Sequence, residues 1–355
     1  MVFHPFHERP QVKILIPKRV PTAMFLIVIA GYALMIVVSP HLHLIDDHNL
    51  LNSLMQGAFF TGYLPPHLVS IGRFYPLVMQ EFNGLTLFFK PSVQLFYGFM
   101  AVEFLALILI LSCLLSFAAN NKNMQRLPLL LLLFSPGFVT AFLRLHIGER
   151  SSLILFSLFL LMYFLFQRAQ NRIFYLFSGV VCANFALYVK EPGFLMLGAF
   201  GFFHLALGWK TIPTRQKIFD GLLVGSSIAF VAVYYAVVFR HQGGVLYGDT
   251  PYSFLFTMSK NLFEYMITDP FLVLVGSGLL GVRTYVVLTK RERPEPVFDA
   301  MLIAGFIYIL AFGKLNIFAY HYLLPAYAFS TAAILYYLVT KGLSEAKSNA
   351  LSFAP

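Results

Sequence analysis

Long, unbroken runs of apolar residues recur through this chain of 355 residues and restrict it to few architectures. The stretch 93–118, for example, holds a single charged residue, Glu103. A helix of about 20 apolar residues crosses a bilayer, and only helices or closed barrels satisfy every backbone polar group in lipid. The runs lack the alternating polarity of barrel strands. With 59% hydrophobic and 11% charged residues, the sequence predicts an all-α integral membrane protein.

Hydropathy over a window of about 19 residues predicts about ten transmembrane helices. No internal repeat, low-complexity tract or soluble domain divides the chain. Residues 1–355 are therefore expected to form one polytopic membrane domain. The predicted spans lie near 21–40, 93–118, 127–145, 151–168, 173–190, 192–208, 220–239, 270–289, 298–313 and 318–339.

The distribution of Lys and Arg predicts the orientation of the chain, because cytoplasmic loops are enriched in these residues. With both termini in the cytoplasm, the inner segments hold about twice as many Lys and Arg as the outer segments. Topology and an anionic inner leaflet then explain the net charge of +10, and no nucleic-acid partner is needed. Arg283, near a helix end, is expected to extend its guanidinium toward the interface.

The longest outer segment, residues 41–92, carries two adjacent carboxylates, Asp46 and Asp47, just beyond the first span. Apolar residues then recur at helical spacing, which indicates an amphipathic helix in the membrane interface. Capping of that helix explains one carboxylate. Two exceed what a cap needs, and their repulsion raises the proton affinity of one, which suits a general base. The apolar positions are Leu50, Leu51, Leu54, Met55, Ala58 and Phe59.

The same outer segment continues to Gly72-Arg73-Phe74-Tyr75-Pro76-Leu77. An acidic pair after the first span, an interfacial helix and a basic residue before Pro-Leu together resemble the GT-C superfamily of polyprenyl-linked glycosyltransferases. Relatives that transfer aminoarabinose to lipid A or mannose to proteins carry Asp-Glu and a Lys-Pro-Pro-Leu-like segment in this loop. The present residues are closer to O-antigen-modifying glucosyltransferases. The resemblance is best over residues 1–90, and no large C-terminal periplasmic domain is expected.

The resemblance implies a GT-C-like helical fold in a bacterial inner membrane, with the active site facing the periplasm. It also implies the reaction, which is inverting transfer of a sugar from undecaprenyl phosphate, or another polyprenyl phosphate, to an extracytoplasmic glycan or lipid acceptor. Such a protein would contact membrane lipids, the lipid-linked donor and the acceptor. No cofactor is required in principle, because cations of the protein can hold the phosphate leaving group.

The chemistry of this transfer selects candidate residues. Departure of a sugar from a lipid phosphate leaves charge that cations must neutralise, and the acceptor hydroxyl needs a base. Asp46 or Asp47 is the expected catalytic base, and the sequence leaves open which of them acts. Arginine suits bidentate phosphate binding. The expected phosphate-binding cations are Arg73, Arg144, Arg150 and Lys190, and the further candidates are His48, Tyr75, Glu149, Glu191, Tyr320 and His321.

Several alternatives stay open. Glu149-Arg150 and Lys190-Glu191 could each be an ion pair that closes its own turn. A divalent metal could bind the histidines and carboxylates of residues 41–48, although no metal-ligand spacing is met. An O-antigen polymerase or ligase would use a diphosphate-linked donor. A lipid or sugar transporter or flippase is a further alternative, although few charges lie deep in the predicted spans and no inverted repeat is visible.

Overall fold

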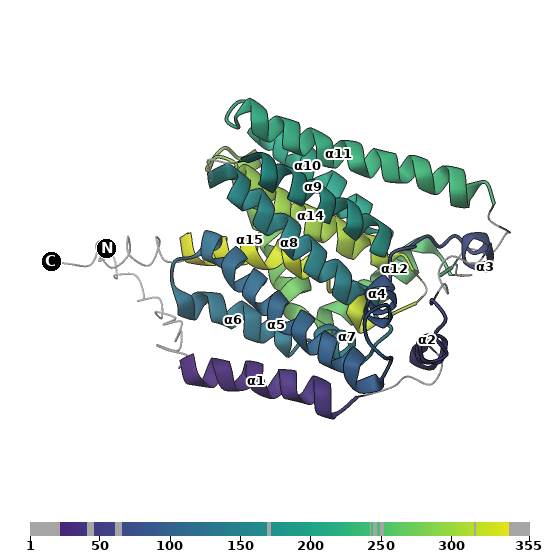
Figure 1. Cartoon of the computed structure of the whole chain (residues 1–355). Coiled ribbons are helices and arrows are strands. Elements are labelled where there is room, and N and C mark those ends of the chain that lie inside the picture. Colours follow the sequence, from purple (N-terminus) through teal and green to yellow (C-terminus); the bar gives the residue numbers. More distant parts are fainter. Residues whose placement is uncertain are drawn as a thin grey trace, which may run out of the picture.

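The fold is a bundle of long helices with three short helices beside one end (Figure 1). The computed structural model describes residues 22–40, 46–60, 66–168, 172–241, 243, 247–248, 252–315 and 317–340. Every regular element within these ranges is a helix. The side of the bundle that carries the short helices is called the loop end, and the other side the opposite end. The short helices are α2 (Asp46–Met55), α3 (Pro66–Ser70) and α4 (Gln80–Thr86).

Six helical stretches of the described residues are long and apolar enough to cross a membrane. Two of them combine an α-helix with a short π-helix, namely α11 (Thr214–Tyr234) with η1 (Tyr235–Phe239) and η2 (Phe271–Val275) with α13 (Gly276–Leu288). The other four are α5 (Val93–Ala118), α8 (Gly148–Arg168), α9 (Arg172–Val189) and α14 (Pro296–Gly313).

The remaining apolar helices are shorter or bent. Helices α6 (Lys122–Leu133) and α7 (Pro136–Leu143) meet at 67° and form at most one broken span. The bend follows from the sequence, because Ser135 caps α7 and Pro136 begins it, so neither residue continues α6. The shorter helices are α1 (Thr22–Val38), α10 (Gly193–Gly208) and α15 (Ala326–Thr340), while α12 (Phe254–Thr268) and η3 (Tyr320–Leu323) complete the fold.

The all-helical class predicted from the sequence is thus confirmed, and the apolar helices fit a multi-pass membrane protein. The predicted number of ten spans is not confirmed, because only six stretches, or seven with the bent pair, meet the length and hydropathy expected of a span. The last predicted span also begins too early, since 318–325 contains a 3-10 turn and α15 begins at Ala326.

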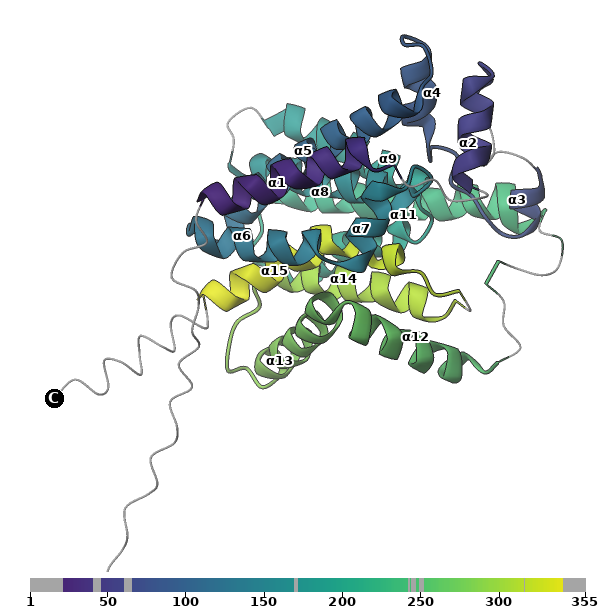
Figure 2. The same cartoon turned by 90° about the horizontal axis from the view of Figure 1, so that it is seen from below.

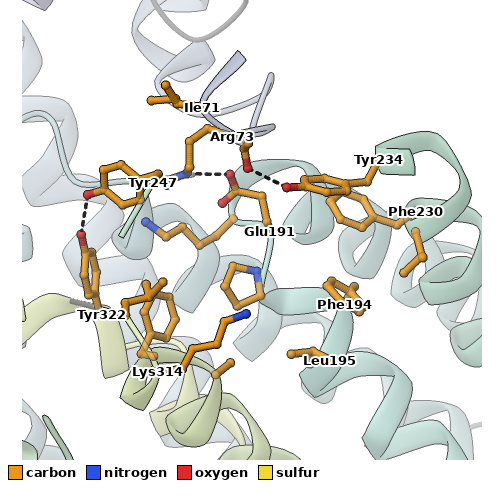
Figure 3. Close-up of a pocket in the computed structure, with 17 residues that line it drawn as sticks. Ile71, Arg73, Glu191, Phe194, Leu195, Phe230, Tyr234, Tyr247, Lys314 and Tyr322 are labelled. Carbon is orange, nitrogen blue, oxygen red and sulfur yellow. Dashed lines mark hydrogen bonds and ion pairs between the residues drawn. The ribbon is translucent and has the colours of Figure 1, made fainter. Parts of the chain in front are cut away.

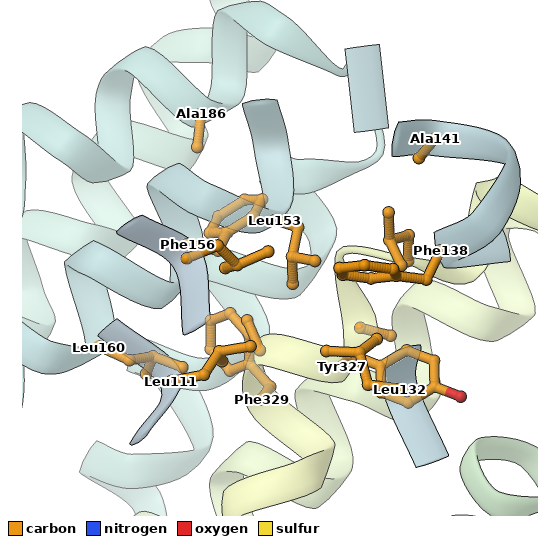
Figure 4. Packing of buried hydrophobic residues seen from close by; sticks show 14 of the residues in the cluster. Leu111, Leu132, Phe138, Ala141, Leu153, Phe156, Leu160, Ala186, Tyr327 and Phe329 are labelled. Carbon is orange, nitrogen blue, oxygen red and sulfur yellow. The ribbon is translucent and has the colours of Figure 1, made fainter. Parts of the chain in front are cut away.

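The core is centred on α8, which packs along α9 and also contacts α5 and α15. Figure 4 shows Phe156 of α8 close to Phe329 of α15, and their ring centroids are 5.8 Å apart. Large apolar side chains also cover the outside of the bundle, as Leu109 and Phe177 do. This is expected when lipid is the solvent, because packing rather than removal from water then holds helices together.

Two glycines allow neighbouring helices to approach each other closely. A Cβ on Gly201 of α10 would lie 2.9 Å from the carbonyl oxygen of Asp220, so only glycine permits the close contact between α10 and α11. A Cβ on Gly137 of α7 would lie 2.5 Å from the carbonyl oxygen of Tyr320. The missing side chain therefore lets η3 pack against the start of α7.

The first outer segment forms the helix that its sequence predicts. Helix α2 begins at Asp46, with both carboxylates in its first turn and three of the predicted leucines buried. The predicted continuation to Phe59 is wrong, since α2 ends at Met55 and Gly57 has a φ of 73°. In Figure 1, α2 is seen end-on while the bundle helices lie across the view. Residues 41–45 and 61–65 of this segment, and both terminal segments, lie outside the described residues.

Arg283, which the sequence predicts to extend toward the interface, pairs with carboxylates at and just before the start of α14. Its side chain is buried, and its guanidinium binds Asp299 at 3.0 Å and Glu292 at 2.5 Å. Asp299 also accepts a hydrogen bond from the Tyr337 hydroxyl. A carboxylate in the first turn of α14 therefore holds Arg283 inside the bundle, which the hydropathy pattern does not reveal.

Candidate active site

A polar cavity of about 450 Å³ lies at the loop end, where the first outer segment meets the ends of α7, α9 and η3. It contains most of the charged residues that the sequence singles out. Figure 2 shows α2 and α3 on the same side of the bundle as the end of α11. The cavity is lined by Asp46, Leu68, Arg73, Tyr75, Val78, Arg144, His146, Ile147, Gly148, Glu149, Val189, Lys190, Tyr247, His321 and Tyr322.

Arg73 is held firmly in the wall of this cavity. Its Nε lies 2.9 Å from Oε1 of Glu191, and the same oxygen accepts the backbone N–H of Phe74 at 2.8 Å. The guanidinium lies over the rings of Tyr75 and Tyr247, 4.5 Å and 4.2 Å from their centroids. In the described residues, no hydrogen bond occupies the two Nη groups of Arg73. These groups remain available for an anionic ligand.

The charge of Arg73 is secure despite its burial. Burial disfavours the charged form, but the Glu191 carboxylate and the neighbouring tyrosines more than compensate and raise the pKa of Arg73 above its ordinary value. The local backbone is also fixed, because Gly72 has a φ of 80° and its carbonyl accepts the Tyr234 hydroxyl at 2.6 Å. Figure 3 shows Arg73 between Tyr247 and Glu191.

Lys190 follows the last turn of α9 and points its ammonium at Glu149 of α8, with 2.5 Å between Nζ and Oε1. The ammonium also lies 4.9 Å from the centroid of the Tyr322 ring. The alternative that each turn closes with its own ion pair is therefore wrong. Charges of one turn pair with charges of another element, as Glu191 does with Arg73, and these pairs fix the elements around the cavity.

Asp46 and Arg144 are the charged residues of the polar cavity that take part in no ion pair within the described chain. Arg144 follows the end of α7 in an extended conformation, and its buried Nε has no hydrogen-bond partner there. A buried donor without a partner is costly, so it marks a position where a ligand or water would be bound. The cavity thus presents one unpaired cation and one unpaired carboxylate.

The two adjacent carboxylates differ in their surroundings. Asp47 is fully buried, and its Oδ1 accepts the backbone N–H of His146 at 2.8 Å. This bond ties α2 to the connection between α7 and α8. Asp46 is partly exposed and lines the polar cavity. The geometry therefore favours Asp46 over Asp47 as the group that meets a substrate.

Two histidines line the cavity, and their burial favours the neutral form of each ring. Burial lowers the pKa of His146, and the nearby Asp46 and Asp47 carboxylates oppose this effect. Burial also lowers the pKa of His321, and Glu149 opposes it. Neutral imidazoles can both accept and donate hydrogen bonds, as recognition of hydroxyl groups requires.

Arg150 is not in the polar cavity, contrary to the prediction that it binds donor phosphate. Its side chain is fully buried, and it lies 3.3 Å from Glu81 and 2.9 Å from Glu103. It also donates to the carbonyls of Ala141 and Leu145 at 3.4 and 3.2 Å. We call Arg150, Glu81 and Glu103 the Arg150 cluster. Glu103 recruits the arginine because a carboxylate within a span needs a partner, and this removes Arg150 from ligand binding.

Two further candidates lie outside the cavity. The side chain of His48 is exposed on α2, and that of Tyr320 is 48% exposed. Three residues that the sequence did not mark belong to the cavity instead, namely His146, Tyr247 and Tyr322. No sequence signal identifies Tyr247, which reaches the site because its N–H bonds the Ile71 carbonyl at 2.8 Å.

A second cavity, of about 340 Å³, adjoins the first at Arg73, Lys190, Tyr247 and Tyr322. We call it the lateral cavity. Figure 3 shows Tyr247, Tyr322 and Lys314 on one side and Phe194, Leu195, Phe230 and Tyr234 on the other. The remaining lining residues are Ile71, Gly72, Glu191, Pro192, Val231, Ala311, Phe312 and Leu315.

The lateral cavity continues into an apolar groove between α10, α11 and α14, of about 420 Å³, which shares Phe194, Leu195 and Val231 with it. The groove extends as far as Val224, seven residues earlier in α11, and therefore runs about 10 Å along the helix. The three hollows form a sequence from charged to amphipathic to apolar. This order matches a ligand with a polar head, an anionic centre and a hydrocarbon tail.

No cluster of three or more metal-binding side chains occurs in the described residues. His41 and His43, part of the metal alternative, lie outside these residues. The chain matches no protein-family model, no curated protein and no solved structure. We therefore infer the function from the geometry of the cavities and from the resemblance of the first outer segment.

Proposed function

We propose that the protein is a GT-C-type inverting glycosyltransferase that moves a sugar from a polyprenyl phosphate to an extracytoplasmic glycan or lipid acceptor. The strongest support for this proposal is the position of Arg73 and Lys190. They lie in the shared wall between a polar cavity that contains Asp46 and an amphipathic cavity that leads to the apolar groove. A small soluble ligand would not fill a polar cavity, an amphipathic cavity and an apolar groove in succession. A lipid-linked sugar has a sugar, a phosphate and a hydrocarbon chain that match the three in that order.

In this proposal the donor phosphate binds at the shared wall. The Nη groups of Arg73 donate hydrogen bonds to two phosphate oxygens, and Lys190 and Lys314 add positive charge on either side. The first isoprene units occupy the lateral cavity beside Phe194 and Phe230, and the chain continues into the groove. The sugar then lies in the polar cavity, where the neutral rings of His146 and His321 bind its hydroxyls.

Asp46 is the proposed general base. It takes the proton of the acceptor hydroxyl, whose oxygen forms a bond to the anomeric carbon as the bond from that carbon to the phosphate oxygen breaks. The electron pair leaves with the polyprenyl phosphate, whose charge Arg73 and Lys190 stabilise. Arg144, unpaired in the described chain, is placed to contact the sugar or the acceptor. A single displacement inverts the configuration at the anomeric carbon.

The direct test is a transfer assay with the full chain in proteoliposomes, supplied with polyprenyl-phosphate sugar and candidate acceptors, with product detected by mass spectrometry. Asp46→Asn keeps the shape of the side chain and should lower the rate by about 10²–10⁴-fold, as loss of a general base does. His48→Gln, on the same helix but outside the cavity, is the control and should keep the parent rate. Transfer at the parent rate by a folded Asp46→Asn variant would refute the assignment. Product formed only from a diphosphate-linked donor would favour the polymerase or ligase alternative.

We also propose that the loop end faces the periplasm of a bacterial inner membrane and that both termini are cytoplasmic, in line with the distribution of Lys and Arg. Cysteine scanning tests this orientation in a chain whose Cys113 and Cys182 are replaced by alanine. His48→Cys, at the exposed surface of the loop end, should react with an impermeant thiol reagent in spheroplasts. Asn121→Cys, between α5 and α6, should react only after lysis. The reverse pattern would invert the orientation.

A lipid or sugar transporter is the second candidate, because the structure buries more charge than the hydropathy pattern indicates. The Arg150 cluster, the pair of Arg283 with Asp299 and the pair of His204 with Asp220 all lie within the bundle. Buried ionisable groups are common in transporters. The same proteoliposomes distinguish the two functions, since a transporter would move the donor across the bilayer without forming a new glycosidic bond.

A further inference from the structure

A separate cavity of about 260 Å³ lies at the opposite end of the bundle, where α10 ends and α11 begins. Figure 1 places the connection between α10 and α11 on the side away from α2, α3 and α4. None of the described residues that line this cavity carries a carboxylate, and we call it the opposite-end cavity. Its lining residues are Gln167, His204, Thr211, Ile212, Pro213, Arg215, Gln216, Pro296 and Val297.

His204, which lines the opposite-end cavity, belongs to a fully buried hydrogen-bonded set that continues behind the cavity wall. Asp220 accepts the Tyr163 hydroxyl at 2.7 Å on one oxygen and lies 2.7 Å from Nδ1 of His204 on the other. The close contact of α10 with α11 at Gly201 makes this pairing possible. The opposite ring nitrogen, Nε2 of His204, is buried and has no hydrogen-bond partner in the described chain. The imidazole thus presents an unused polar atom in a residue that lines the cavity.

The start of α11 contributes positive potential at the same place. This helix has 21 residues, and its N-cap residue Pro213 supplies no side-chain cap. No backbone hydrogen bond uses the N–H groups of Thr214 and Arg215. The uncapped N-terminus and the Arg215 side chain therefore both favour an anion. The unpartnered Nε2 of His204 lies in a residue that lines the same cavity.

The surface around the cavity has the character of a membrane interface. Trp209 is 59% exposed, and the Lys217 ammonium lies 4.4 Å from the centroid of its ring. Tryptophan is enriched at the boundary between lipid and water, and basic residues near it attract anionic lipid headgroups. Ile212, Pro213 and Pro296 give the cavity an apolar side next to its donors.

We propose that the opposite-end cavity binds a phosphate group, most simply the headgroup of an anionic phospholipid in the leaflet away from the polar cavity. Asp220 holds the His204 ring through Nδ1, and an Nε2–H group of that ring donates to a phosphate oxygen. Arg215 and the free N–H groups of α11 bind the other oxygens, and the apolar side contacts the glycerol. This site is independent of sugar transfer and uses none of the residues proposed for it.

Native mass spectrometry of the purified full chain tests the proposal, with phosphatidylglycerol titrated into detergent and phosphatidylcholine as the neutral comparison. Arg215→Gln removes an exposed cation and should weaken phosphatidylglycerol binding about tenfold or more, which is the usual effect of losing a charge-assisted hydrogen bond. Lys210→Gln is the matched control, because Lys210 is exposed on the same connection but does not line the cavity. It should retain the parent affinity.

The two possible sources of phosphate are separated by competition. If phosphatidylglycerol remains bound in a large excess of inorganic phosphate, the cavity is a lipid site. If inorganic phosphate displaces the lipid, the cavity is a site for free phosphate. Both results support phosphate binding in the opposite-end cavity. His204→Gln is a second variant, since its amide can still bond Asp220 but offers no ring nitrogen at the position of Nε2. Equal losses in Arg215→Gln and Lys210→Gln would show attraction by surface charge only and overturn the proposal. Unchanged binding in Arg215→Gln would do so as well.

Discussion

The polar cavity and the Arg150 cluster lie close together along the chain and contain the same types of residue. They differ in whether the charges are paired within the protein. In the Arg150 cluster, one guanidinium meets two carboxylates and several carbonyls and is fully buried. In the polar cavity, six residues along the chain from Arg150, Arg144 has no ion pair in the described residues, and neither has Asp46. Charge that is fully paired holds helices in place, and charge left unpaired is available to a ligand.

Arg73 stands between these extremes. Glu191 orients it through a single nitrogen, and the tyrosine rings hold its plane, while its two Nη groups stay unused in the described chain. A preorganised cation of this kind binds phosphate at low entropic cost. The comparison therefore predicts that variants of Arg150 affect stability and that variants of Arg73 affect ligand binding.

The largest effect is expected for Arg150→Met. Removing one partner of a buried ion pair leaves uncompensated charge, here on Glu81 and Glu103, and typically costs about 3–5 kcal/mol. Unfolding in detergent, followed by circular dichroism against denaturant, measures the loss. Arg144→Met is the control and should change the free energy of unfolding by less than about 1 kcal/mol, because Arg144 forms no ion pair there. Equal destabilisation by the two substitutions would remove the distinction between the cluster and the cavity.

An intermediate effect is expected for Arg73. Arg73→Ala should weaken equilibrium binding of a polyprenyl phosphate about 10- to 100-fold through loss of charge-assisted hydrogen bonds. Arg73→Lys keeps the charge but loses the planar fork, so it should retain part of the affinity. Binding is measured by isothermal calorimetry in detergent, with Arg240→Ala as an exposed control outside both cavities. Affinity that is unchanged in Arg73→Ala would exclude this residue from the phosphate site.

The smallest effect concerns pH. Burial holds the pKa of His321 below its ordinary value of 6.5, so the unfolded chain binds the proton more readily than the folded chain. The stability associated with the neutral ring is therefore fully present above about pH 6.5 and is lost as the pH falls through the lower folded value. His321→Gln should flatten this part of the stability profile. A profile with the same slope in the variant would contradict the assignment.

Asp269 provides the comparison of opposite sign. Burial raises the pKa of this carboxyl from 3.8 to about 6, and hydrogen bonds from Tyr327 and Leu272 only partly oppose the rise. Its protonated form therefore adds stability below pH 3.8, and that contribution is lost as the pH rises through about 6. Asp269→Asn should remove the loss of stability that accompanies rising pH, whereas His321→Gln should remove the loss that accompanies falling pH. The two variants should therefore change the pH profile of stability in opposite directions.

The sequence predicted the parts of the structure that depend on local patterns. Continuous apolar runs predicted helices, and the recurrence of leucines behind Asp46 predicted α2. The bend between α6 and α7 has local causes in Ser135 and Pro136, yet hydropathy alone merges the two helices. Local patterns were less informative wherever pairing across the bundle decided the outcome.

Long-range pairing explains the errors at the candidate site. Nothing near Arg150 in the sequence indicates that it pairs with Glu103 and Glu81. Similarly, nothing near Asp47 indicates that its carboxylate accepts the backbone N–H of His146. Likewise Lys190 and Glu149 are 41 residues apart in the chain and form one ion pair. Five of the charged candidates from the sequence line one cavity, but only the packing of α2, α8 and α9 separates the paired charges from the unpaired ones.

The central claim is that available cations in the shared wall of the two cavities bind the donor phosphate. Its most direct test is a cryo-electron microscopy structure of the full chain in nanodiscs with a polyprenyl phosphate bound. The expected result is phosphate density within hydrogen-bond distance of the Arg73 Nη groups and close to Lys190, with the first isoprene units in the lateral cavity. Phosphate density at the Arg150 cluster, or a lipid that leaves Arg73 uncontacted, would contradict the account.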